Sequence, residues 1–168
     1  YTFKHSVDVA TMAMIVSRQY GFNDEQVQQI GVSGLLHDIG KIGIQDSILK
    51  KQGKLTDEEY SIIKTHVEKS VEMIRVLPHM DYVIPAVLSH HERYDGKGYP
   101  NGIRGNEIPI LGRILTVCDS FDAMVSRRAY KEAMSIEYAT GELERGKGTQ
   151  FDPDVAQAFI ELIRENPS

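Results

Sequence analysis

The chain has little of what marks secreted, membrane-spanning or disulfide-bonded proteins. A single cysteine among 168 residues excludes a disulfide framework and a cysteine-based zinc module, and it suits a reducing compartment. The longest apolar run, residues 83–88, contains a proline and falls far short of the roughly 18 residues of a membrane span. We therefore expect a protein that does not enter a membrane.

A strong positive charge is also missing. The net charge is −5, from 24 acidic and 19 basic side chains. Residues 90–131 nevertheless carry seven basic and five acidic side chains, whereas residues 132–168 carry three basic and eight acidic ones. A locally positive middle in an acidic chain suits a small anionic ligand better than a nucleic acid, which needs a strongly basic face. We therefore expect no DNA binding.

Signals for β-strands are absent as well, because no segment alternates between apolar and polar residues over sufficient length. Apolar residues at helical spacing, with capping boxes at Asn23–Gln26 and Thr56–Glu59, predict helices instead. The predicted helices cover approximately residues 3–20, 23–40, 56–77, 81–91, 109–124, 135–146 and 152–163. The one long loop, residues 92–109, is rich in glycine, and loops of that length are mostly functional or disordered. The sequence predicts an all-α bundle of about seven helices.

The length of 168 residues fits one domain with a core of its own. The chain begins inside a helical pattern, with no signal peptide and no initiator methionine. We expect residues 1–168 to be a single domain excised from a longer regulatory protein.

Histidines and aspartates fall in pairs beside the predicted helices. His37 precedes Asp38, His90 precedes His91, and Asp119 lies in an apolar stretch where a lone carboxylate is costly to bury. A helix advances about 100° per residue, so His37 and Asp38 cannot both point at one distant atom, but they can bracket two metals with the carboxylate bridging. Imidazole with carboxylate suits Fe, Mn, Zn, Co or Ni better than Ca or Mg. From spacing alone, a metal site and ordinary packed histidines are equally good interpretations.

Two segments resemble a known family. Residues 37–41 read HDIGK, similar to the signature of the HD phosphohydrolase superfamily, and residues 90–100 read HHERYDGKGYP, which resembles the hallmark of its HD-GYP subgroup. The similarity continues in order at Ile108-Pro109, Arg113-Ile114, Asp119, residues 121–124, Tyr130-Lys131 and residues 148–153. It covers nearly the whole chain. HD-GYP domains are all-α, metal-dependent phosphodiesterases that linearise the bacterial messenger cyclic di-GMP, so the resemblance implies this fold and this activity.

The resemblance implies a site for two divalent metals, with Fe or Mn expected first and Zn, Co or Ni as further options. It places one metal among His5, His37, Asp38 and Asp119, and the other among Asp38, His66, His90 and His91. Some family members hold a third metal through a glutamate one turn before the first histidine. That position here is Tyr1, a poor ligand, so we expect two metals and hydrolysis to linear pGpG, and the further step to GMP stays open.

Roles in the reaction follow from the same resemblance. We expect a hydroxide bridging the metals to attack phosphorus beside Asp38, while Lys41 binds and steadies the phosphate oxygens. Arg128 and Lys131 would hold the second phosphate, and Tyr99 would stack on a guanine or hydrogen-bond a phosphate. Where relatives often read Asp-Arg-Pro-Tyr, residues 127–130 read RRAY, which makes this segment more basic and looser.

Expected partners are cyclic di-GMP, GGDEF-type cyclase domains through the GYP segment, and a receiver or sensor domain before residue 1. Two other functions stay open. One is an HD phosphohydrolase acting on another nucleotide or cyclic dinucleotide such as cyclic GMP-AMP, because base choice depends on pocket shape. The other is a catalytically silent cyclic-di-GMP-binding module, against which the intact ligand set argues.

Overall fold

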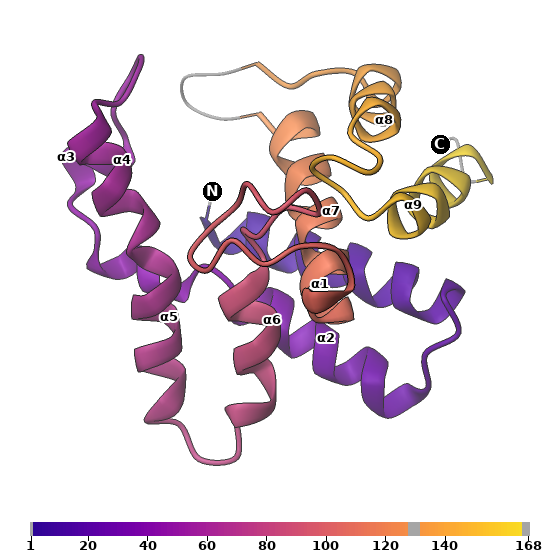
Figure 1. The fold of residues 1–168 in the computed structure, drawn as a ribbon, viewed down its shortest axis with the longest axis horizontal. Coiled ribbons are helices and arrows are strands. Elements are labelled where there is room, and N and C mark those ends of the chain that lie inside the picture. Colours follow the sequence, from indigo (N-terminus) through magenta and orange to yellow (C-terminus); the bar gives the residue numbers. More distant parts are fainter. Residues whose placement is uncertain (1, 128–131, 166–168) are drawn as a thin grey trace.

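The regular structure of the chain is helical (Figure 1). The computed structural model describes residues 2–127 and 132–165. Within them lie nine α-helices and three short 3₁₀ helices: α1 (Thr2–Gln19), α2 (Asp24–Leu36), η1 (Ile39–Gly43), α3 (Asp46–Leu49), α4 (Asp57–Lys64), α5 (His66–Arg75), η2 (Asp81–Val83), α6 (Ile84–Ser89), η3 (Gly105–Glu107), α7 (Ile110–Val125), α8 (Ile136–Arg145) and α9 (Pro153–Glu165). No helix in these ranges is long and apolar enough to cross a membrane. The all-α prediction is confirmed.

The helix predicted over residues 56–77 is in fact two helices, and the reason lies at Thr65. Its hydroxyl donates a 2.5 Å hydrogen bond to the carbonyl of Ile62, and its backbone N–H donates to the same carbonyl at 3.1 Å. A threonine side chain that bonds back to the helix competes with the regular ladder, so α4 ends one residue earlier and α5 begins at His66. The two predicted capping boxes, at Asn23 and Thr56, are both present.

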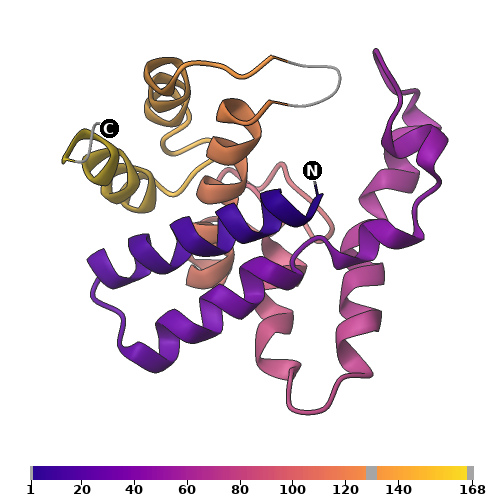
Figure 2. The ribbon, with the colours of Figure 1, turned by 180° about the vertical axis from the view of Figure 1, so that it is seen from behind.

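Helix α7 lies in the middle of the molecule, with the α1–α2 hairpin and the α5–α6 pair on two sides and α8 and α9 on another (Figures 1 and 2). The main core joins α7 to α1, α2, α8 and α9 through fully buried side chains that include Val16, Ile30, Leu115, Leu143 and Ile160. Each such side chain stabilises the fold by roughly 1.5–3 kcal/mol. A second, smaller core holds α5 against α6.

Two glycines allow the close contacts that bring the chain's histidines together. A Cβ at Gly34 in α2 would lie 2.8 Å from the Cα of Ala10 in α1. A Cβ at Gly40 in η1 would lie 2.2 Å from the carbonyl oxygen of His66, and the Gly40 N–H donates to Ser70 Oγ at 2.7 Å. Only a residue without a side chain fits at either contact. The segment after α2 therefore rests directly on α5.

Candidate metal centre

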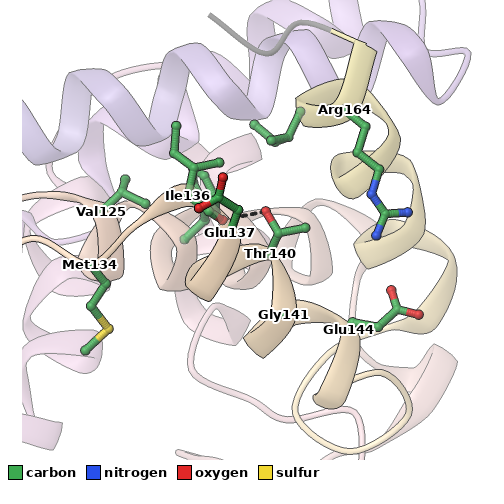
Figure 3. A pocket seen from close by; sticks show the side chains of 10 residues that line it. Val125, Met134, Ile136, Glu137, Thr140, Gly141, Glu144 and Arg164 are labelled. Carbon is green, nitrogen blue, oxygen red and sulfur yellow. Dashed lines mark hydrogen bonds between the residues drawn. The ribbon is translucent and has the colours of Figure 1, made fainter.

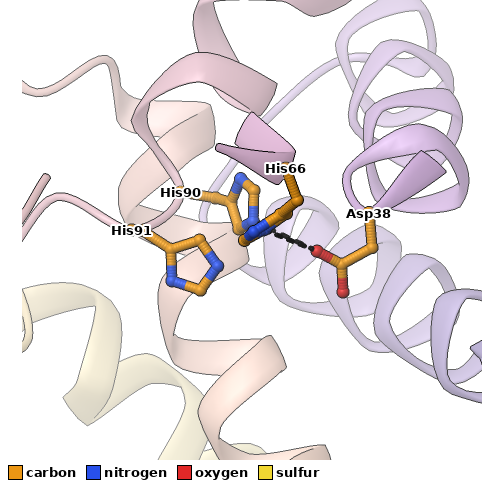
Figure 4. Close-up of side chains that lie close together, drawn as sticks. All are labelled: Asp38, His66, His90 and His91. Carbon is orange, nitrogen blue, oxygen red and sulfur yellow. Dashed lines mark ion pairs between the residues drawn. The ribbon is translucent and has the colours of Figure 1, made fainter. Parts of the chain in front are cut away.

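Seven side chains with metal-ligating atoms meet where α1, α2, α5, α6 and α7 converge. They form two groups that share one aspartate: His5, His37, Asp38 and Asp119, and Asp38, His66, His90 and His91. Within each group the candidate ligand atoms all lie within 4.8 Å of one another. Figure 4 shows the second group, in which the three imidazoles and the Asp38 carboxylate face one another. The tertiary structure thus brings together all seven residues that the sequence singled out.

Asp38 directs one oxygen at each group. Its Oδ2 lies 3.1 Å from His37 Nε2 and 3.8 Å from His5 Nε2. Its Oδ1 lies 3.2 Å from His66 Nε2 and 3.5 Å from His90 Nε2. A carboxylate in this position can bridge two cations, as in other sites that hold metal pairs.

Three of the imidazoles are oriented by the backbone that precedes them. Each Nδ1 lies within hydrogen-bond distance of the backbone carbonyl three residues earlier, so Nδ1 carries the proton and donates it to that oxygen. The pairs are His37 with Gly34 (2.5 Å), His66 with Ile63 (2.7 Å) and His90 with Val87 (2.6 Å). The lone pair of each ring is consequently on Nε2, the atom that faces the centre.

Several of these inward atoms have no hydrogen-bond partner although they are buried. They are Nε2 of His37, His66, His90 and His91, and Oδ1 of Asp38. A buried polar atom without a partner costs about 1–3 kcal/mol, so five in one place need a compensating ligand. Cations that accept these lone pairs would provide the missing partners. A donor set of imidazole and carboxylate suits transition metals. The residues present therefore fit metal ions.

The two carboxylates and two of the imidazoles favour the protonation states that bind metal. Burial by itself raises the pKa of Asp38 and of Asp119, but the neighbouring histidines outweigh it and hold both pKa values well below the usual range. Burial lowers the pKa of His90, and it lowers that of His91 far more. Ionised carboxylates and neutral imidazoles are the forms that bind metal.

The pKa values of His5 and His37, by contrast, are raised. Burial by itself lowers both, but nearby carboxylates outweigh it. Asp119 and Asp122 raise the pKa of His5, and Asp38 and Asp119 raise that of His37 well above its usual value. A cation bound there must therefore displace protons.

Two supporting carboxylates were missed in the sequence. Asp122, 3% exposed, places Oδ2 at 2.6 Å from Nδ1 of His5 and accepts a hydrogen bond from Ser126. Its position three residues after Asp119, hence on the same helix face, was the available signal. Glu92, 2% exposed, accepts the backbone N–H groups of Asn101 and Gly102 and so fixes the long loop.

The residues predicted to bind substrate differ in whether the structure places them beside the cluster. Lys41 places Nζ 3.0 Å from Oδ2 of Asp38 and lines a cavity of about 310 Å³ beside the cluster. Arg93, to which no role was assigned, lines the same cavity. Tyr99 is not among the lining residues and lies against His91 instead. Arg128, Lys131 and Tyr1 lie outside the described residues.

A larger hollow, of about 920 Å³, lies away from the histidines, where α7, α8 and α9 meet (Figure 3). Its lining is mainly apolar, from residues such as Val125, Met134 and Ile136, with Glu137 and Arg164 at the surface. It contains none of the seven candidate ligands, so we do not assign it to the chemistry of the cluster.

Similarity to known proteins agrees with the site. The family model described as "HD domain" matches residues 2–155. A Thermotoga maritima protein named "Cyclic di-GMP phosphodiesterase" is 42% identical over 166 residues, 98% of this chain and 45% of that protein. A Vibrio cholerae protein named "3'3'-cGAMP-specific phosphodiesterase 2" is 37% identical over 95% of this chain and 31% of its own. The chain thus spans less than half the length of these relatives.

Solved structures confirm the fold. An HDG"Y"P protein from Bdellovibrio bacteriovorus superposes with a TM-score of 0.78 at 19% identity, over 98% of this chain and 53% of that one. The family match covers most of the chain, and the relatives bear out the resemblance seen in residues 90–100. The chain therefore belongs to the HD domain family, within its HD-GYP subgroup.

Proposed function

We propose that this chain is a metal-dependent phosphodiesterase that hydrolyses cyclic di-GMP to linear pGpG. The observation that carries the proposal is the pair of four-residue ligand groups that share Asp38 beside a cavity. Further support comes from the relative of Thermotoga maritima named for this activity, which is 42% identical over nearly the whole chain. We place the activity in the cytoplasm, where this messenger acts, and treat residues 1–168 as one catalytic domain.

Two divalent metals fit the two groups, and we expect Fe or Mn, with Zn, Co or Ni able to substitute. His5, His37 and Asp119 would hold one ion, and His66, His90 and His91 the other, with Asp38 between them. When bound, such a pair supplies an activated water and a Lewis acid for the leaving oxygen. Because Tyr1 stands where a third ligand set would need a glutamate, we expect pGpG to accumulate before GMP.

The chain's own residues position the phosphodiester. Lys41, whose ammonium group reaches Oδ2 of Asp38, holds a positive charge at the cavity and can bind the phosphate oxygens as negative charge develops. Arg93 lines the same cavity, but its guanidinium is engaged with Asp95 through two hydrogen bonds. The second phosphate of the ring would be bound by Arg128 and Lys131. A GGDEF-type partner and a receiver or sensor domain stay predictions.

A second candidate substrate is 3'3'-cGAMP. The relative from Vibrio cholerae that is named for this dinucleotide is 37% identical over 95% of the chain, close to the value for the cyclic di-GMP relative. Both substrates share the phosphodiester ring and differ in one base, so the metal groups alone do not discriminate between them.

The test is hydrolysis of each dinucleotide by protein loaded anaerobically with Fe(II) or Mn(II), with products separated by chromatography. A His37→Ala/Asp38→Ala double variant removes ligands from both groups, and Lys54→Ala, an exposed change away from the site, serves as the matched control. We expect pGpG from the parent and from Lys54→Ala but not from the double variant. Faster turnover of 3'3'-cGAMP than of cyclic di-GMP would reassign the substrate. If neither dinucleotide is hydrolysed by protein with both metals bound, the proposed phosphodiesterase activity is refuted.

A further inference from the structure

His91 differs from its neighbours in how its ring is oriented. His37, His66 and His90 each donate Nδ1–H to the backbone carbonyl three residues earlier. In the described part of the chain His91 makes no such bond, and its Nε2 has no hydrogen-bond partner. Its orientation therefore depends on ring contacts: the His91 centroid lies 4.9 Å from that of His66 and 4.2 Å from that of His90.

Tyr99 takes the place of the missing hydrogen bond. Its ring stacks on that of His91, with centroids 4.9 Å apart and planes inclined by only 11°. The backbone N–H of Tyr99 also donates to the carbonyl oxygen of His91 at 3.2 Å. The approach depends on Gly98, where a Cβ would lie 2.4 Å from both the His91 carbonyl oxygen and the Arg93 nitrogen. Ring and backbone of Tyr99 thus contact the same residue.

The other side of Tyr99 is held by α4. The ring of Tyr60 meets it edge to face, with centroids 6.4 Å apart and planes inclined by 81°. The ammonium group of Lys64 lies 5.5 Å from the centre of the Tyr99 ring and 4.9 Å from that of Tyr60. Edge-to-face pairs and cations over aromatic faces are both attractive at these separations. A chain of contacts therefore runs from α4 through Tyr99 to His91.

We propose that Tyr99 is a positioning residue for His91, and that Tyr60 and Lys64 keep Tyr99 in place. Stacking keeps the His91 imidazole turned toward Asp38, His66 and His90, as a hydrogen bond does for the other rings. This rests on the proposed metal site and assigns Tyr99 a role that is separate from substrate binding. Removing a group that orients a metal-ligating histidine typically weakens metal binding 10–100-fold. The effect should be confined to one of the two ions.

Metal titration tests the proposal without any hydrolysis assay. Metal-free protein is titrated anaerobically with Co(II), and the visible absorption of the bound ion reports the number and affinity of sites. His91→Ala identifies which ion depends on His91. We expect Tyr99→Phe, which keeps the ring, to match the parent. Tyr99→Leu should bind that one ion about tenfold more weakly and leave the other unchanged. The double variant Tyr99→Leu/His91→Ala should bind no worse than His91→Ala alone.

Unchanged binding by Tyr99→Leu would overturn the proposal, as would equal losses in Tyr99→Phe and Tyr99→Leu, since those would point to the hydroxyl. If Tyr99→Leu does not fold, Tyr60→Leu provides the test. We expect it to bind the same ion more weakly than the parent, but with a smaller loss than Tyr99→Leu would cause. Unchanged affinity in Tyr60→Leu would contradict the proposal. A protein that binds two ions as described but hydrolyses no dinucleotide would refute the proposed function and leave the role of Tyr99 intact.

Discussion

Nδ1 of His5 and Oδ2 of Asp122 lie 2.6 Å apart inside the protein, and this pair links the N-terminal helix to α7. The other ring nitrogen of His5 lies 2.6 Å from Oδ1 of Asp119. A carboxylate behind a metal-ligating histidine fixes the tautomer and increases the basicity of the ligand nitrogen. The arrangement implies that Asp122 acts on metal binding without itself touching a metal.

We predict that Asp122→Asn weakens binding of the ion held by His5 about tenfold or more and leaves the other ion unaffected. Isothermal titration with Mn(II) measures both affinities. Ser126→Ala is the matched control, because it removes only the hydrogen bond to the far oxygen of Asp122 and should have a smaller effect. Equal affinities in Asp122→Asn and the parent would show that His5 needs no such support.

Metal binding should stabilise the fold, because the buried inward atoms of His37, His66 and His90 lack partners without it. An ion present at 100 times its dissociation constant adds about 2.7 kcal/mol of stability. For a domain of this size that corresponds to a rise in Tm of roughly 5–10 °C. Differential scanning fluorimetry with Mn(II), and again after adding EDTA, measures the shift. A His37→Ala/Asp38→Ala protein should show little response, and a full response there would place the stabilising ion elsewhere.

Gly40→Ala should destabilise the protein strongly. The added Cβ would lie 2.2 Å from the carbonyl oxygen of His66 and 2.4 Å from the nitrogen of Ser70, so backbone must move. Overpacking of this kind costs about 1–3 kcal/mol or more, and the same movement shifts His66. Urea unfolding measures the free energy. Gly43→Ala is the control: its Cβ would meet only the flexible side chain of Lys69, at 3.1 Å, so stability should change by less than about 0.5 kcal/mol.

The Arg93–Asp95 pair predicts a pH dependence of the loop's contribution to stability. The Arg93 guanidinium, at 2.9 Å, lowers the pKa of Asp95. A carboxyl group whose pKa is lower in the folded state adds stability above its unfolded pKa of about 3.9, and this is lost as pH falls through the lowered folded pKa. Because Arg93 is partly exposed, we expect Asp95→Asn to cost only about 0.5–1 kcal/mol at pH 7.

That cost should begin to shrink as the pH falls below about 4, where Asp95 becomes protonated in the unfolded state, and it should vanish below the lowered folded pKa, where both states are protonated. Chemical unfolding of parent and Asp95→Asn at pH 7, 5 and 3.5 gives the difference directly. Comparing the two proteins at each pH cancels the titration of the buried histidines. A difference that stays constant down to pH 3.5 would mean that the ionic form of Asp95 does not matter.

Capping residues and apolar spacing were sufficient to predict most of the helices, but they did not predict where a helix is interrupted. The capping boxes at Asn23 and Thr56 are properties of four consecutive residues, and both formed as predicted. The break at Thr65 arises because its hydroxyl donates to the Ile62 carbonyl and so competes with the helical backbone hydrogen bonds. The spacing of apolar residues does not reveal such a bond. The α3 helix, only four residues long, has too short a pattern to be detected.

The sequence by itself determined the family, the helical class and the identity of the seven candidate ligands, because these depend on short motifs and on residue chemistry. The family resemblance also implied their division into two groups that share Asp38, and only the tertiary structure decided which atoms face one another. The two oxygens of Asp38 face different groups, Asp122 supports His5, and Tyr99 stacks on His91. Each of these relationships joins residues that lie on different elements. Such relationships arise from helix packing around close contacts like that of Gly40 with α5, and no local pattern encodes their geometry.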